Sequence, residues 1–167
     1  MGWCRVSWHY KLQGPVVCDF WNQGLNDSYI VRSKRGKHVL RVYRAGWRTR
    51  REILSELDLL NYLHRQKVPV SRPIRRGDGR HLQGVEAPEG RRYAALFSFA
   101  PGKVAIDRRK AYRYGALAAT IHASTDRQSK RHPRFHLDLK HLLADPLAGM
   151  AVQPQHRRHD LDYLHGV

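Results

Sequence analysis

The sequence predicts an α+β fold in which a small antiparallel sheet with one helix precedes a segment that is only helical. Three observations lead to this prediction. Short β-rich runs lie on both sides of one amphipathic helix, turn residues separate these runs, and the pattern becomes helical after Pro101-Gly102. The 167 residues suffice for one ordinary domain, or for one small lobe with part of a second.

The first element is a predicted β-hairpin. Residues 29–32 and 38–43 are rich in β-branched and aromatic side chains, and Gly36 between them supplies the turn. A helix is predicted next, over residues 50–66, because apolar side chains recur there at helical spacing. That helix should end before Val68-Pro69, since proline disfavours helix at the residue that precedes it.

The elements after the helix complete the pattern. Residues 70–74 and 81–85 are predicted as short strands on either side of the turn 77–79, and the apolar run 93–99 suits a buried strand. A helix capped by Asp107 is predicted through residue 122. A shorter helix is expected between Leu137 and Leu143, and the sequence from Asp145 onward shows weak periodicity.

The chain is strongly basic, with 31 Lys and Arg against 14 Asp and Glu and a formal net charge of +17. Such a surface attracts nucleic acid, anionic lipid or phosphorylated ligands without a specific site. The arginines are scattered, however, and their clusters are not interleaved with aromatic side chains as in a groove for single strands. Specific nucleic-acid binding is therefore not expected, although a non-catalytic basic module for nucleic acid or another polyanion remains the alternative function.

Composition also bears on the compartment and on metals. No stretch of about 18 apolar residues is present, so no membrane span is expected. A disulfide between Cys4 and Cys18 is possible, but free thiols of a cytoplasmic protein are the expected state. Several histidines lie in basic, irregular sequence far from any cysteine, which does not indicate convergent metal ligands. No metal site is predicted.

Glu56 is the most informative residue of the predicted helix. It projects between Leu60 and Leu63, inside the apolar stripe, where a carboxylate is costly unless a cation meets it. Arg41 lies between two apolar residues on the preceding strand and is such a cation. A strand cation paired with a helix carboxylate orients the nucleotide in kinase N-lobes. A purely structural ion pair, or a glutamate that reaches water, explains the two residues equally well.

The segment before the hairpin's first strand is a second candidate. Gly24, Asn26 and Asp27 favour a turn, and with Ser28 they could present backbone N–H groups to a phosphate. No Gly-Lys-Ser/Thr sequence follows, so this is not a Walker A loop. Taken alone, the segment indicates only a turn.

Taken in order, these segments resemble the aminoglycoside phosphotransferase and choline-kinase-like family, over roughly residues 20 to 147. The resemblance lies in the order of the segments, because no single motif is diagnostic. They are NQGLNDSY (22–29), HVLRV (38–42), SELDLL (55–60), VPV (68–70), ALFSFAPG (95–102) and LAATIH (117–122). The resemblance implies a protein-kinase-like N-lobe, with a five-stranded antiparallel sheet and one helix, followed by the first helices of a truncated C-lobe.

The resemblance also implies a division of the chain and a set of nucleotide contacts. The expected parts are an N-terminal segment (1–19), a nucleotide-binding N-lobe (20–100), a hinge (101–106) and a partial helical C-lobe (107–167). Residues 24–28 would cover the phosphates of ATP, and Arg41, where many members have Lys, would pair with Glu56. Ser98, Phe99 and Ala100 would meet adenine through their backbone, and His122 would have a supporting role.

The chain departs from the family's pattern where catalysis should occur. Members carry a His-Gly-Asp-x-x-x-x-Asn loop and a later aspartate that holds Mg²⁺, but no asparagine follows Asn61 in this sequence. No catalytic residue is therefore assigned, and Mg²⁺ is expected for the family without ligands here. The sequence predicts the ATP-binding portion of a kinase that acts on a small-molecule hydroxyl acceptor. This portion is expected to be inactive as given. It is also expected to self-associate through its exposed C-lobe helix.

Overall fold

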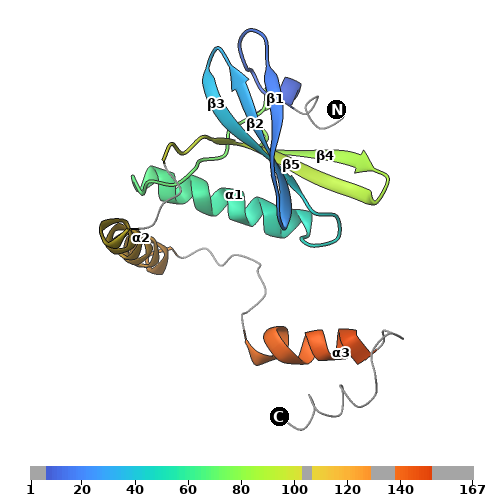
Figure 1. The fold of residues 1–167 in the computed structure, drawn as a ribbon, viewed down its shortest axis with the longest axis vertical. Coiled ribbons are helices and arrows are strands. Elements are labelled where there is room, and N and C mark those ends of the chain that lie inside the picture. The colour runs from blue at the N-terminus through green and yellow to red at the C-terminus, as the bar shows by residue number, and fades with distance from the viewer. Residues whose placement is uncertain (1–6, 103–106, 129–137, 152–167) are drawn as a thin grey trace. The chain divides into compact units, whose positions relative to one another are not determined.

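The structure of the protein is a computed structural model that describes residues 7–102, 107–128 and 138–151. The chain divides into two compact units, residues 1–132 and 133–167, and each is described by itself. In the first unit a sheet packs on a helix, and a second helix follows; the second unit is helical where it is described (Figure 1). The predicted α+β fold, a kinase-like sheet with one helix followed by helices, is confirmed.

The sheet is antiparallel, with strand order β1-β2-β3-β5-β4. Its strands are β1 (Val17–Gln23), β2 (Asn26–Ser33), β3 (Gly36–Tyr43), β4 (Leu82–Ala87) and β5 (Gly90–Ser98). The predicted hairpin forms β2 and β3, and its turn has Gly36 at a φ of 100°, a conformation that favours glycine.

Two strand predictions need correction. Residues 70–74 do not form a strand; they make an isolated bridge, Pro73 to Phe97, because prolines lack the N–H that a ladder requires. Strand β1 has no counterpart among the predicted elements. It is an edge strand whose residues are almost all exposed, so its sequence carries little of the alternation that reveals a strand.

The first two helices form where they are predicted, whereas the helix predicted to end at Leu143 continues through residues 145–151, where only weak periodicity is expected. Helix α1 (Arg50–Arg65) begins with a capping box between Thr49 and Glu52, and α2 (Arg108–Asp126) begins at Asp107, whose side chain accepts from the Lys110 N–H at 2.8 Å. In the second unit, a π-helical turn (Lys140–Ala144) leads into α3 (Asp145–Ala151). No helix among the described residues is long and apolar enough to cross a membrane. The prediction of free thiols is wrong for Cys18, which is disulfide-bonded.

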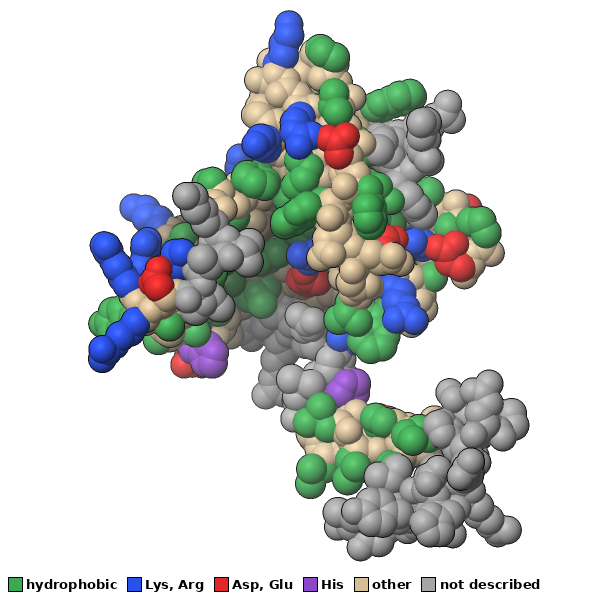
Figure 2. All heavy atoms as spheres, in the orientation of Figure 1, with side chains coloured by type: hydrophobic (Ala, Val, Ile, Leu, Met, Phe, Trp, Pro, Cys, Tyr) green, Lys and Arg blue, Asp and Glu red, His purple; other side chains and the backbone are tan. Residues whose placement is uncertain are grey.

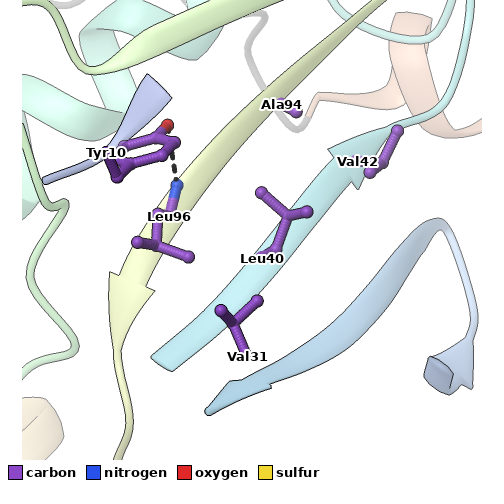
Figure 3. Packing of buried hydrophobic residues seen from close by; sticks show 6 residues of the cluster. All are labelled: Tyr10, Val31, Leu40, Val42, Ala94 and Leu96. Carbon is purple, nitrogen blue, oxygen red and sulfur yellow. Dashed lines mark hydrogen bonds between the residues drawn. The ribbon is translucent and has the colours of Figure 1, made fainter. Parts of the chain in front are cut away.

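The sheet separates two apolar cores. On one face α1 packs through Ile53 and Leu57 against Tyr43 and Phe97 (α1 lies across the sheet in Figure 1). The segment before β1 covers the other face, with Tyr10 at its centre. Figure 3 shows this second cluster, which consists of Tyr10, Val31, Leu40, Val42, Ala94 and Leu96. The N-terminal segment thus contributes directly to the core of the sheet.

Tyr10 should make the stability of this lobe sensitive to high pH. Its hydroxyl accepts from the Leu96 N–H at 3.1 Å and donates to the His81 carbonyl at 3.0 Å, and burial raises its pKa from 10.0 to about 12. Between these values the unfolded chain releases the proton that the folded chain keeps, so stability falls as pH rises. Tyr10→Phe should reduce the loss of unfolding free energy between about pH 9 and about pH 11.5 by about 2 kcal/mol.

Urea unfolding of both proteins at the two pH values measures this difference. The comparison cancels the titration of lysines and of the other tyrosines, and the lost hydrogen bond to Leu96 is a constant offset at both pH values. An equal loss in the two proteins would contradict the assignment.

Candidate nucleotide site

The predicted pair between Arg41 and Glu56 is formed. Arg41 lies on β3 between Val39 and Tyr43, which belong to the core on the α1 side, so alternation places its side chain on the face that α1 covers. Its Nη1 donates to the Glu56 Oε1 at 2.8 Å. The two side chains are 36% and 24% exposed, which leaves the pair accessible to a ligand.

Aromatic rings fix the position of the Arg41 guanidinium. Its central carbon lies 4.9 Å from the ring centroid of Phe97 and 5.9 Å from that of Tyr43, within range for cation–π attraction. Burial, and next the negative charge of Glu56, raise the pKa of Tyr43 above its ordinary value, so this ring carries a neutral phenol. The arginine is therefore held at one end by a carboxylate and along its plane by two rings.

The Arg41–Glu56 pair contributes modestly to stability, because it is only partly buried. Arg41→Met and Glu56→Gln should each lower the free energy of unfolding by about 1–2 kcal/mol, rather than the 3–5 kcal/mol of a fully buried pair. A double-mutant cycle by urea unfolding should give a coupling energy of about 1 kcal/mol between the two sites. Strictly additive effects would show that the contact contributes nothing in solution.

The loop residues predicted to cover phosphates fall into two groups. Gly24 lies in the turn between β1 and β2, while Asn26, Asp27 and Ser28 begin β2. Ser28 pairs directly with Arg41 in the ladder, and paired residues of antiparallel strands share a face. The structure therefore brings Ser28 to the side of the sheet where the ion pair lies.

Asn26 and Asp27 have structural contacts instead. The side-chain carbonyl of Asn26 accepts from the Arg44 N–H at 3.2 Å, which ties the turn to the end of β3. Asp27 alternates with Ser28 and so faces the opposite side of the sheet from Arg41. There its Oδ2 accepts from the Arg92 Nη2 at 2.7 Å. A groove of about 540 Å³ beside this pair is lined by Gly24, Asp27 and Arg92 together with Gln23, Leu25, Arg44, Ala45 and Glu89.

Arg92 is a residue that the sequence analysis missed. It is buried, and its guanidinium binds two carboxylates, Asp27 and Glu89, and the carbonyls of Val42 at 3.3 Å and Tyr43 at 2.9 Å. The sequence signal was its place two residues before the buried Ala94 on β5, which puts the two side chains on the same face of the sheet. Arg92 connects β2, β3 and β5 behind the turn that contains Gly24.

The hinge residues follow directly on β5. The Ser98 N–H donates to the Arg72 carbonyl at 2.9 Å, and the Ser98 carbonyl accepts from the Ser71 hydroxyl at 3.1 Å. Both backbone groups of Ser98 are thus used, which leaves Phe99 and Ala100 as the hinge positions that can meet a ligand. A cavity of about 500 Å³ adjoins Ala100, and its other lining residues are Pro69, Pro101, Gly102, Lys110, Arg113, Tyr114 and Leu117.

His122, the histidine for which the resemblance implies a supporting role, belongs to α2. His122 lies on the exposed surface of α2, where its backbone carbonyl accepts from the Thr125 hydroxyl at 2.9 Å. Over the described residues, no group of three or more His, Cys, Asp or Glu side chains is placed to hold a metal ion.

Comparison with known proteins identifies relatives of this arrangement. The chain matches the model of the phosphotransferase enzyme family over residues 16–165. An uncharacterized protein of Synechocystis is 40% identical over 152 residues, and one of Deinococcus radiodurans is 39% identical over 146 residues. These alignments cover 89% and 87% of the chain, and 42% of each relative. The chain thus spans less than half the length of both relatives.

Solved structures of kinases are also similar. The microcompartment-associated aminopropanol kinase is 25% identical with a TM-score of 0.74, over 84% of this chain and 46% of that one. An amicoumacin kinase, solved in complex with AMP-PNP, Ca²⁺ and Ami, is 19% identical with a TM-score of 0.64, over 92% of this chain and 53% of that one. The similarity to the amicoumacin kinase shows a shared fold.

Proposed function

We propose that this chain, which belongs to the phosphotransferase enzyme family, is the ATP-binding portion of a small-molecule kinase that acts on a hydroxyl group. The observation that carries the proposal is the Arg41–Glu56 pair, joined at 2.8 Å on the face of the sheet that α1 covers. Ser28, which pairs with Arg41 in the ladder between β2 and β3, lies on the same face, and the hinge follows β5 of the same sheet. A cation, a hydroxyl and free hinge backbone are what a nucleotide requires.

In this proposal ATP supplies the phosphoryl group, and the residues of this chain hold and orient it. Arg41 binds a phosphate oxygen, and Glu56 keeps its guanidinium in place, because Arg can donate to phosphate and carboxylate at once. Ser28 donates its hydroxyl to a phosphate. The backbone of Phe99 and Ala100 forms hydrogen bonds with the edge of the adenine ring. Asp27 does not touch the nucleotide; through its ion pair with Arg92 it holds the turn between β1 and β2 in place.

Nucleotide titration tests this proposal. Arg41→Ala should weaken AMP-PNP binding by about 10- to 100-fold in calorimetry, since a charge-assisted hydrogen bond to phosphate contributes about 1.5–3 kcal/mol. Arg51→Gln is the matched control, because it removes an exposed arginine from α1 outside the site. Equal weakening by both substitutions would show that only the net positive charge attracts the nucleotide.

The acceptor is proposed to be a small molecule with a hydroxyl group. The microcompartment-associated aminopropanol kinase is named for an amino alcohol, so an amino alcohol is the first acceptor to test. The cytoplasm is the proposed compartment, as the place where a kinase meets ATP.

Self-association through α2 is a further proposal. Tyr112 and Tyr114 on this helix are 79% and 63% exposed, and large exposed apolar side chains favour association. Light scattering should therefore show a mass that rises with protein concentration, and replacing both tyrosines by serine should reduce that rise. A concentration-independent monomer would contradict the proposal.

The alternative function is a non-catalytic module for nucleic acid or another polyanion, and the net charge of +17 favours it. Figure 2 shows Lys and Arg side chains spread over the drawn face. Binding of RNA that weakens steeply with salt and is indifferent to AMP-PNP would favour this alternative over the kinase.

A further inference from the structure

A cleft at the N-terminal end of α1 lies outside the proposed nucleotide site. Its volume is about 330 Å³, and four arginines line it: Arg50, Arg76, Arg80 and Arg91, hereafter the arginine cleft. They come from α1, from the turn before β4 and from β5. The remaining lining residues are Leu82, Gln83, Gly84 and Tyr93. Neither Arg41, Glu56 nor the hinge contributes to it.

Arg76 is held in a fixed orientation. Its Nη1 donates to the Leu82 carbonyl at 2.9 Å, and its Nη2 lies 3.1 Å from the Asp78 carboxylate. The side chain is 13% exposed, and its Nε is a buried donor without a hydrogen-bond partner among the described residues. A guanidinium fixed in this way is pre-organised, so little side-chain entropy is lost when it binds an anion.

The Arg91 guanidinium lies against Gly84 of β4. A Cβ added at Gly84 would come 3.0 Å from the Arg91 Nη2, so the guanidinium would have to shift by a few tenths of an ångström to make room for a larger residue. The guanidinium also lies 5.9 Å from the ring centroid of Tyr93, and its carboxylate partner, Glu86, is 3.6 Å away at an exposed position. Arg91 thus lines the cleft with only a weak, solvent-exposed ion pair.

The charges of the arginine cleft are not balanced. Asp78 and Glu86 offset two of the four guanidinium groups, whereas Arg50 and Arg80 have no carboxylate partner among the described residues. Like charges that share one cleft repel each other unless an anion joins them.

We propose that the arginine cleft binds the phosphate group of a small phosphorylated molecule. A phosphate dianion supplies the two missing negative charges and several acceptor oxygens for the guanidinium forks. A nucleic-acid strand fits less well, because it carries one charge per phosphodiester and needs an extended basic track, whereas this cleft is a single small recess.

Calorimetric titration of the full chain with glycerol 3-phosphate tests the proposal. Arg50→Gln combined with Arg80→Gln should weaken binding at least about tenfold, because two charge-assisted contacts are lost and no carboxylate is stranded. Arg51→Gln is the matched control, since it removes an exposed charge one residue from Arg50 but outside the cleft. Arg41→Ala should leave the affinity unchanged, which separates this site from the nucleotide site.

The outcomes decide the proposal in either direction. Saturable binding that depends on Arg50 and Arg80, but not on Arg51 or Arg41, supports it, whatever the nucleotide titrations show. Absence of saturable binding, or equal weakening by Arg51→Gln, overturns it. Displacement of the ligand by a short single-stranded RNA that binds more tightly, with a steep salt dependence, would assign the cleft to a polymer instead.

Discussion

Replacing Arg92 by methionine should lower the free energy of unfolding by about 3–5 kcal/mol, the range observed when one partner of a buried ion pair is removed. Arg92 is 9% exposed and donates to Asp27, Glu89 and the carbonyls of Val42 and Tyr43. Methionine fills much of the same space but leaves Asp27, which is 18% exposed, without its cation. The loss should therefore come from stranded polar groups rather than from a cavity.

Arg91 provides the control for this prediction. It is the preceding residue on β5, carries the same charge and is 64% exposed, with an ion pair to an exposed glutamate. Arg91→Met should change the free energy of unfolding by less than about 1 kcal/mol. Urea unfolding of the three proteins measures both effects. Similar midpoints for Arg92→Met and the unsubstituted chain would mean that the Arg92 contacts do not hold the three strands together.

The second large effect concerns turnover. The 167-residue polypeptide should bind nucleotide without transferring its phosphoryl group to an acceptor. Kinase catalysis requires a base at the acceptor hydroxyl and Mg²⁺ held by an asparagine and an aspartate, and no asparagine follows Asn61. Losing these groups costs several orders of magnitude in rate, since charge neutralisation and positioning supply most of the acceleration.

An assay of purified polypeptide with ATP and an amino alcohol measures this rate. The matched measurement is AMP-PNP binding in the same preparation, which shows that a negative result does not come from an unfolded protein. Stoichiometric transfer that disappears in Arg41→Ala would contradict the prediction. It would mean that Asp138, Asp160 or a second chain provides the base.

The sequence alone predicted the parts of the site that interrupt a regular pattern. Glu56 lies inside an apolar stripe and Arg41 between apolar neighbours, and an ion pair between the two was one of the explanations that this pattern left open. The hairpin, α1 and α2 were predictable because the spacing of their apolar residues and the turn residues at their ends indicate the same secondary structure. A local pattern of this kind indicates the secondary structure, and it also shows which polar side chains occupy positions where an apolar one is expected.

The parts that sequence did not predict depend on contacts distant in the chain. The hydrogen bond between Tyr10 and Leu96 joins residues 86 positions apart, and the one between Asp27 and Arg92 joins residues 65 apart. Nothing in the N-terminal segment shows that Tyr10 closes a core, and the turn-like sequence around Asp27 does not show which face of the sheet its side chain takes. Strand β1 was missed because an exposed edge strand lacks a buried face.

The most direct test of the central claim is to map where AMP-PNP binds on the labelled polypeptide by NMR. We expect the largest amide shift changes at Ser28, Arg41, Phe99 and Ala100, and we expect Arg41→Ala to remove them. The groove beside Asp27 and the arginine cleft should remain unchanged at ligand concentrations that saturate the first set. Shift changes confined to Arg50, Arg80 and Arg91, with none at Arg41 or the hinge, would contradict a nucleotide site on the α1 face of the sheet.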